Sequence, residues 1–123
     1  MTRHEAMVRM RHMLDHAKEA VALMRGKTRT DLDTDRILQL AVVRLAEIVG
    51  EAASRVPKDD CVRYPSVPWP QITSLRNRLI HGYHAVDLDI LWEIITNDFP
   101  PLIAKLEKIV PPEIKKNKNE ENK

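Results

Sequence analysis

Residues 36–56, RILQLAVVRLAEIVGEAASRV, are the stretch that most directly indicates the fold. Their apolar side chains recur at intervals of three and four, the repeat of an α-helix. They cover more than one stripe, so we expect this helix to pack between others. Thr30 or Asp31, in the preceding TRTDLDTD, is expected to cap its start. The apolar set consists of Ile37, Leu38, Ala41, Val42, Leu45, Ile48, Val49 and Ala52.

The same repeat occurs on both sides of this segment. It predicts a first helix over residues 2–25, ended by Gly26, and a third helix over QITSLRNRLIHG (71–82), ended near Gly82. Only three glycines are present and no strand-like alternation is found, so the sequence predicts an all-α fold without strands.

The last helices are interrupted by prolines. Asp87 or Asp89 is expected to cap a fourth helix, NDFPP (97–101) to kink or break it, and a short fifth segment to begin around Leu102. Residues 57–70 hold four prolines and read as an ordered connection that Trp69 anchors to the core. The sequence therefore divides into a helical domain, 1–110, and a charged tail, 111–123, which is expected to be disordered.

Composition limits the possible functions. The net charge is only +2, so any nucleic acid must be bound by a local basic patch. The single cysteine, Cys61, cannot form an internal disulfide, and no apolar run is long enough to span a membrane. We expect a protein of the cytoplasm without a membrane anchor.

No metal or cofactor site is predicted. DLDTD (31–35) resembles a calcium loop, but Arg36 stands where that loop needs glycine. His12 and His16 lie one helical turn apart, but no third possible ligand follows at a sequence spacing typical of a metal site. Cys61 has no neighbouring histidine in the sequence and is given no role.

Polar residues are concentrated in RNRLIHGY, residues 76–83. On a continuous helix Asn77 and His81 would share one face, and Arg76 and Tyr83 an adjacent one. An arginine fork suits phosphate oxygens, histidine exchanges protons near neutral pH, and asparagine can orient either the imidazole or a ligand. This set suits RNA cleavage, in which the ribose 2′-hydroxyl supplies the nucleophile and cationic side chains replace a metal. Spacing alone leaves an ordinary solvated helix face as the alternative.

The motif LRNRLIHGY (75–83) lies between VPW (67–69) and VDLDILWEIITNDFPPLIAKLEKI (86–109), and LAEIVGEAASRV (45–56) precedes it. Together these segments resemble the HEPN-domain toxins of toxin–antitoxin pairs whose antitoxin is a minimal nucleotidyltransferase, the HepT-like proteins. The resemblance covers about residues 5–110. The family motif, an arginine, four residues beginning with a polar one, a histidine, any residue and a tyrosine, is complete.

The resemblance implies an up-and-down bundle of four to five helices that forms a homodimer, with both motifs in a cleft at the interface. It implies a metal-independent endoribonuclease in which Arg76 holds the scissile phosphate and His81 acts as general acid or base, supported by Asn77 and Arg78. It further implies that the partner nucleotidyltransferase transfers AMP to Tyr83 and silences the toxin. The alternative is a purely structural role, in which Tyr83 packs against the end of the helix.

Two other functions remain open. The same groove could hold a nucleotide or RNA without cutting it, while the dimer docks on its nucleotidyltransferase partner. A purely structural helical adaptor is the third possibility, and in that case Arg76 and His81 would both be replaceable by alanine.

Overall fold

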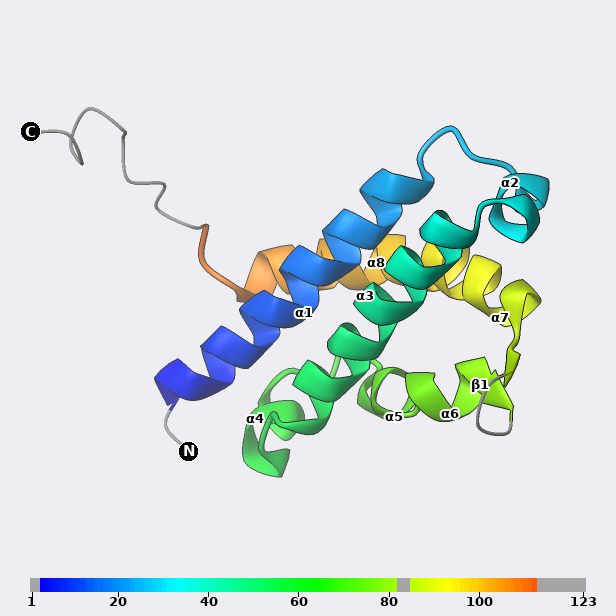
Figure 1. Ribbon diagram of the computed structural model, residues 1–123. Helices are drawn as coiled ribbons and strands as arrows, with labels where there is room; N and C mark the ends of the chain where they lie inside the picture. Colours follow the sequence, from blue (N-terminus) through cyan, green and yellow to red (C-terminus); the bar gives the residue numbers. More distant parts are fainter. Residues whose placement is uncertain (1–2, 82–84, 113–123) are drawn as a thin grey trace, which may run out of the picture.

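Helices provide almost all of the regular structure in the computed structural model, which describes residues 3–81 and 85–112 (Figure 1). The predicted all-α class is confirmed. Three long helices form the frame: α1 (Arg3–Met24), α3 (Arg36–Ser54) and α8 (Phe99–Ile109). α1 packs along α3 and, on its other side, against α8, which crosses behind both in Figure 1.

The first helix ends as the sequence predicts. α1 runs to Met24, and Gly26 follows with a φ of +76°. This left-handed backbone conformation favours glycine, which has no Cβ to clash with the preceding turn. Here the sequence alone placed the helix end correctly.

A separate short helix precedes α3, and the predicted caps were wrong. α2 (Arg29–Thr34) begins at Thr28, whose hydroxyl accepts the backbone N–H of Asp31. The Asp31 carboxylate in turn accepts the backbone N–H of Thr28, and this hydrogen bond lowers the pKa of Asp31. Asp35 caps α3. Thr30 caps neither helix because the chain starts α2 two residues earlier.

α3 lies at the centre of the bundle, as its apolar pattern predicts. It contacts α1, α2, α5 and α6, so apolar residues are buried on more than one side. Gly50 allows α5 to approach α3 closely, since an added Cβ would lie 3.1 Å from the carbonyl oxygen of Ile72. A larger residue here would push α5 and α6 away from α3.

The proline-rich connection is ordered, and Trp69 anchors it as predicted. Trp69 is buried, and its indole N–H lies 3.1 Å from the carbonyl oxygens of both Cys61 and Tyr64. The connection also contains a short helix that the prolines had obscured, α4 (Lys58–Arg63). The indole thus fixes the end of α4 beside the start of the next helix.

The predicted third helix is divided and ends early. α5 (Trp69–Thr73) and α6 (Leu75–Leu79) meet at Ser74, and the chain then becomes extended at β1 (Ile80–His81). The prediction of a helix up to Gly82 was therefore wrong, and so was the prediction of no strands.

Tertiary hydrogen bonds explain the early helix end. β1 pairs in antiparallel register with β2 (Ala85–Val86), with Ile80 opposite Val86 and His81 opposite Ala85. The backbone N–H of Asp87 also donates to the Leu79 carbonyl at 2.8 Å. Backbone groups that another helical turn would satisfy are therefore satisfied by pairing with the returning chain.

The predicted fourth helix begins at one of its two expected caps. Asp87, one of the two predicted caps, accepts the Ile90 N–H at the start of α7 (Leu88–Glu93). Asp89 instead binds Arg29 of α2 at 2.7 Å, and the carboxylates of Asp33 and Asp89 raise the pKa of Arg29.

The prolines do not interrupt this run. At NDFPP the chain forms a π-helical turn, η1 (Ile94–Asp98), and continues directly into α8. Proline is tolerated there because the first turn of a helix needs no donor N–H. The fifth segment therefore begins at Phe99, earlier than predicted, and the tail prediction falls mainly on residues 113–123, outside the described part.

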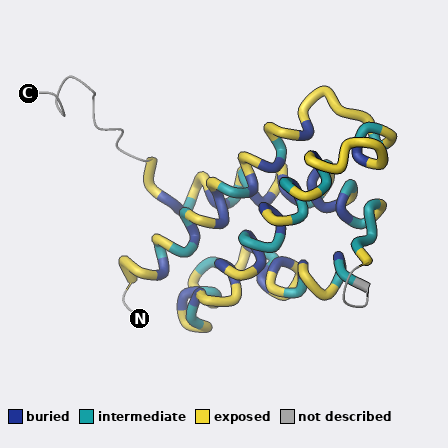
Figure 2. The backbone as a smooth tube through the Cα atoms, viewed as in Figure 1, coloured by how far each residue is buried: buried dark blue, intermediate teal, exposed yellow. Residues whose placement is uncertain are grey.

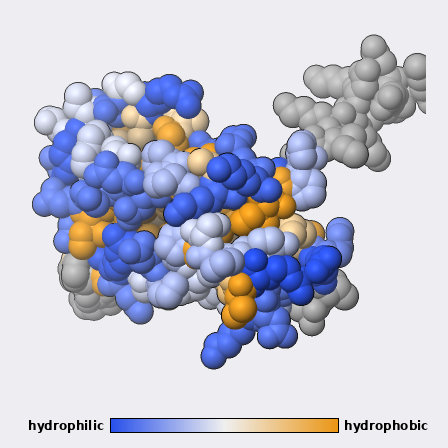
Figure 3. Space-filling view, turned by 180° about the vertical axis from the view of Figure 1, so that it is seen from behind, coloured by the Kyte–Doolittle hydropathy of each residue, from blue (hydrophilic) through white to orange (hydrophobic). Residues whose placement is uncertain are grey.

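The core is one continuous apolar cluster, which lies between the long helices (Figure 2). Seen from the opposite side, hydrophobic side chains reach the surface only as small patches among hydrophilic ones (Figure 3). The largest fully buried side chains include Phe99, Met10, Met13, Ile72, Leu75, Leu79, Leu91 and Leu106. Two of them, Leu75 and Leu79, belong to the motif helix and fix its orientation.

Candidate active site

The buried leucines of α6 determine where the motif residues lie. Leu75 and Leu79 are fully buried, and the three polar residues between them are therefore turned outward. Arg76 and Asn77 are exposed, whereas Arg78 is half-buried. α6 thus presents two arginines in different surroundings, one exposed and one half-buried.

Arg76 is the freer of the two arginines. Its side chain is 75% exposed, and its Nε lies 3.9 Å from Oε2 of Glu47 on α3. Among the described residues, no hydrogen bond or ion pair is made by its two terminal nitrogens. That edge of the guanidinium is open for two parallel hydrogen bonds to a phosphate.

Arg78 is held within the fold. Its Nη2 lies 3.2 Å from Oδ2 of Asp98 in η1, and both side chains are only 33% exposed. This ion pair joins the motif helix to the π-helical turn. The carboxylate partly compensates the charge of Arg78, so Arg78 contributes less to a basic patch than Arg76 does.

His81 follows α6 as the second residue of β1, and only its backbone is described. The backbone N–H of Ile80 donates to the carbonyl of Arg76, which places β1 directly against the last turn of α6. Because the helix has ended, the shared helical face predicted for Asn77 and His81 does not exist. Tyr83 lies outside the described residues.

A cleft lies beside Arg76, between α3 and the β1–β2 pair, and we call it the α3–β cleft. Its volume is about 240 Å³, and five aliphatic residues line its walls. Three polar residues, Arg36, Gln39 and Glu47, also line it. The aliphatic lining consists of Leu40, Val43, Ile80, Val86 and Leu88.

Glu47 connects this cleft to Arg76, and sequence reasoning missed it. Its side chain is 20% exposed, and it both lines the cleft and pairs with Arg76. Within the sequence it is one of several charged residues on an amphipathic helix. Only the packing of α6 against α3 shows that it belongs to the site.

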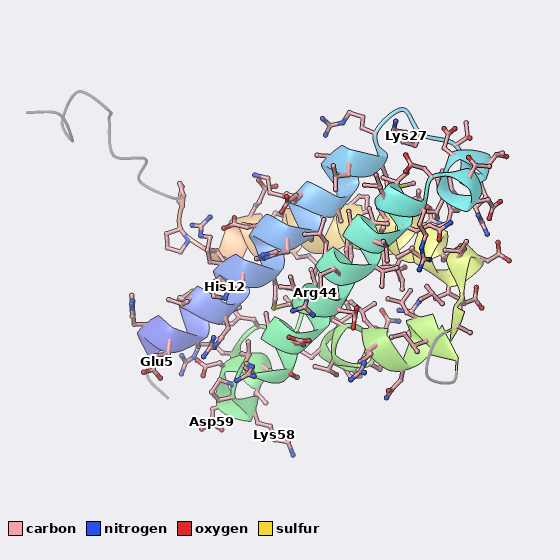
Figure 4. The ribbon with its side chains drawn as sticks, in the orientation of Figure 1. Glu5, His12, Lys27, Arg44, Lys58 and Asp59 are labelled. Atoms are coloured by element: carbon pink, nitrogen blue, oxygen red, sulfur yellow. The ribbon has the colours of Figure 1, made fainter. Side chains whose placement is uncertain are left out.

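Two large apolar side chains near this cleft are exposed to solvent on the outer face of α3. Ile37 is 80% exposed and Leu40 is 55% exposed, which is unusual for large aliphatic side chains on one helix. Farther along α3, Arg44 (Figure 4) pairs with Glu51 at 3.4 Å. The exposed side of α3 therefore changes from apolar to charged along its length.

The remaining candidates lie apart from this site. Burial raises the pKa of the Cys61 thiol, which keeps it protonated and poorly nucleophilic. His12 and His16 contact each other edge to face on α1. Within residues 3–81 and 85–112 no three His, Cys, Asp or Glu side chains gather as a metal-ligand group, and no helix there has the length and apolarity of a membrane span.

Comparison with known proteins identifies the family of the chain. A family model described as ribonuclease HepT-like matches residues 13–109, which include α6 and both strands. The chain belongs to the HepT-like ribonuclease family. The expected family is thereby confirmed, on a match that spans most of the chain.

Curated relatives carry names consistent with this family. A "Probable ribonuclease HepT" of Thermococcus cleftensis is 37% identical over 100 residues, which are 78% of this chain and 91% of the relative. A "Putative RNase" of Methanocaldococcus jannaschii is 34% identical, with 80% of this chain and 81% of the relative covered. Another "Putative RNase", of Caldanaerobacter subterraneus, is 33% identical, with 82% and 90% covered. No solved structure matches the chain.

Proposed function

We propose that this HepT-like protein is a ribonuclease toxin of a toxin–antitoxin pair, which cuts RNA in the cytoplasm without a metal ion. The observation that carries the proposal is Arg76. It lies on α6 with its side chain 75% exposed, and among the described residues its only recorded side-chain contact is the 3.9 Å ion pair of its Nε with Glu47. Membership in the HepT-like ribonuclease family makes RNA the substrate class.

The proposed reaction is a transesterification at phosphorus. The ribose 2′-oxygen forms a bond to phosphorus while the bond to the 5′-oxygen of the next nucleotide breaks. The 2′-hydroxyl gives up its proton to a base, and the leaving 5′-oxygen receives a proton from an acid. His81 takes one of these roles and Arg76 stabilises the charge on the phosphoryl oxygens, with Asn77 and Arg78 in support. The products carry a 2′,3′-cyclic phosphate and a 5′-hydroxyl.

A homodimer would complete this site. One chain offers one Arg76 and one His81, and the chain as a whole carries a net charge of only +2. Two copies facing each other would double the local positive charge along a cleft. The exposed Ile37, which is not among the residues that line the α3–β cleft, supports an interface near the start of α3.

The activity is tested with protein whose mass shows that Tyr83 is unmodified. In EDTA the wild-type protein is expected to cut RNA and leave cyclic phosphate ends. His81→Ala is expected to reduce the rate by about 10²- to 10⁴-fold, the usual contribution of a general acid or base. Absence of cleavage by wild-type protein would refute the ribonuclease function. RNA binding without cleavage, weakened by His81→Ala, would instead identify a noncatalytic binding module.

We further propose that a nucleotidyltransferase antitoxin silences the protein by transferring AMP from ATP to Tyr83. The tyrosine oxygen attacks the α-phosphate and pyrophosphate leaves. The attached nucleotide adds negative charge and bulk where RNA must bind, so it would compete for Arg76. With the cognate antitoxin and ATP, the intact protein should gain the mass of AMP and lose cleavage, whereas Tyr83→Phe should show neither change. AMP on another residue of Tyr83→Phe would refute this assignment.

A further inference from the structure

The α3–β cleft adjoins Arg76 through Glu47, which lines the cleft and pairs with this arginine. Pockets for drug-sized ligands have volumes of about 300 to 1,000 Å³, so the 240 Å³ of this cleft suits a single flat ring system. Its aliphatic walls can cover the faces of a base. Glu47 lines the cleft and its Oε2 lies 3.9 Å from Nε of Arg76, so the cleft and this arginine are adjacent.

The other two polar residues of the cleft already bind each other and the backbone. The side-chain amide of Gln39 donates to the carbonyls of Leu32 and Asp33, at 2.8 and 3.1 Å. Its side-chain oxygen accepts from Arg36 at 3.2 Å. Gln39 therefore has little capacity left to recognise a ligand.

Glu47, in contrast, keeps its capacity to accept hydrogen bonds. The ion pair with Arg76 is its only contact recorded among the described residues, and 3.9 Å is too long for a hydrogen bond. Both carboxylate oxygens can still accept an N–H donor. The Glu47 side chain is only 20% exposed and receives no hydrogen bond from the described part of the chain, so it can accept hydrogen bonds from the polar edge of a ligand.

We propose that the α3–β cleft binds one base of the RNA substrate and that Glu47 selects guanine; this inference rests on the ribonuclease function proposed above. A carboxylate accepts hydrogen bonds and cannot donate them, so it favours a base edge with adjacent donors. Guanine presents its ring N1–H beside its amino group, which matches the two oxygens of Glu47. Uracil presents a single N–H between two carbonyl oxygens, and these would repel the carboxylate.

Mononucleotide binding tests the cleft independently of cleavage. Titration of GMP, CMP and UMP, followed by NMR, should show GMP bound at least about tenfold more tightly, the discrimination expected of a bidentate base contact. Glu47→Gln should abolish the difference, because the amide replaces one acceptor by a donor. Glu51→Gln, one turn further along α3 and paired with Arg44, is the matched control and should keep the preference.

A second variant separates base binding from effects on Arg76. Val43→Phe is designed to fill the cleft from α3 while both residues of the Glu47–Arg76 ion pair are kept. In a folded protein it should weaken GMP binding about tenfold or more and leave binding of inorganic phosphate unchanged. Equal affinities for all three nucleotides in wild-type protein would refute the base site, whether or not RNA is cut.

Cleavage of an RNA of mixed sequence tests whether the base preference also governs the reaction. An active wild-type enzyme should cut with guanine enriched at one fixed position next to the cut, and Glu47→Gln should lose this enrichment. Cleavage without any base preference would refute the guanine site and leave the ribonuclease function standing. If Val43→Phe instead converts a dimer to a monomer in sedimentation experiments, the cleft is covered by the second copy and the base site is wrong.

Discussion

Replacing Arg76 by alanine is expected to reduce the rate of RNA cleavage by about 10²- to 10³-fold, the usual loss when one stabilising group is removed from a transition state. The free energy of unfolding of this variant should hardly change. The Arg76 side chain is 75% exposed, and a solvent-exposed ion pair contributes about 0–1 kcal/mol. Single-turnover cleavage in EDTA and urea unfolding measure the two effects separately.

Arg78→Ala is the matched control for this substitution. It removes the same charge from the same helix, but it breaks the pair with Asp98 that joins α6 to η1. Its larger effect should therefore be on unfolding, up to about 1 kcal/mol, with a smaller loss of cleavage than in Arg76→Ala. Equal cleavage losses in the two variants would show that only net charge matters, and would contradict the role given to Arg76.

Replacing Phe99 by alanine is expected to lower the free energy of unfolding by about 3–5 kcal/mol. Phe99 is fully buried and is the only phenylalanine of the chain, placed where η1 continues into α8. Its removal would leave a cavity where these elements meet the core. Small domains have a total stability of about 5–15 kcal/mol, so much of it would be lost.

Urea unfolding followed by circular dichroism measures this loss, and Val62→Ala provides the control. Val62 lies on α4 and is 77% exposed, so its truncation should change the free energy of unfolding by no more than about 0.5 kcal/mol. A loss below about 1 kcal/mol in Phe99→Ala would mean that the core collapses around the cavity, or that this part of the core contributes little.

Local sequence was sufficient where local interactions decide the structure. The apolar repeat of α3 predicted a central helix, Gly26 marked the end of α1, and Trp69 was identified as the anchor of the proline-rich connection. Helical repeats, a glycine in the left-handed region and a buried indole all act within a few residues. The same reasoning misplaced the cap of α3, since several acidic and hydroxyl residues nearby can serve.

The motif could be recognised in the sequence, but the backbone conformation of the motif and the contacts of its side chains could not be predicted from it. The resemblance implied different roles for Arg76 and Arg78, but only the position of Asp98 shows that Arg78 is engaged in the fold. The end of α6 at Leu79 depends on strand β2, which returns to pair with β1. Helical periodicity carries no information about such a partner.

By itself, the sequence determined the all-α class, the positions of α1 and of the central helix α3, and the family, because these follow from periodicity and from sequence motifs. The tertiary structure alone decided that Glu47 of α3 lies beside Arg76 of α6 and that a cleft forms between α3 and the two short strands. These features arise where separate segments pack together. Their geometry is set by the buried contacts of Gly50, Leu75 and Leu79, which no local pattern encodes.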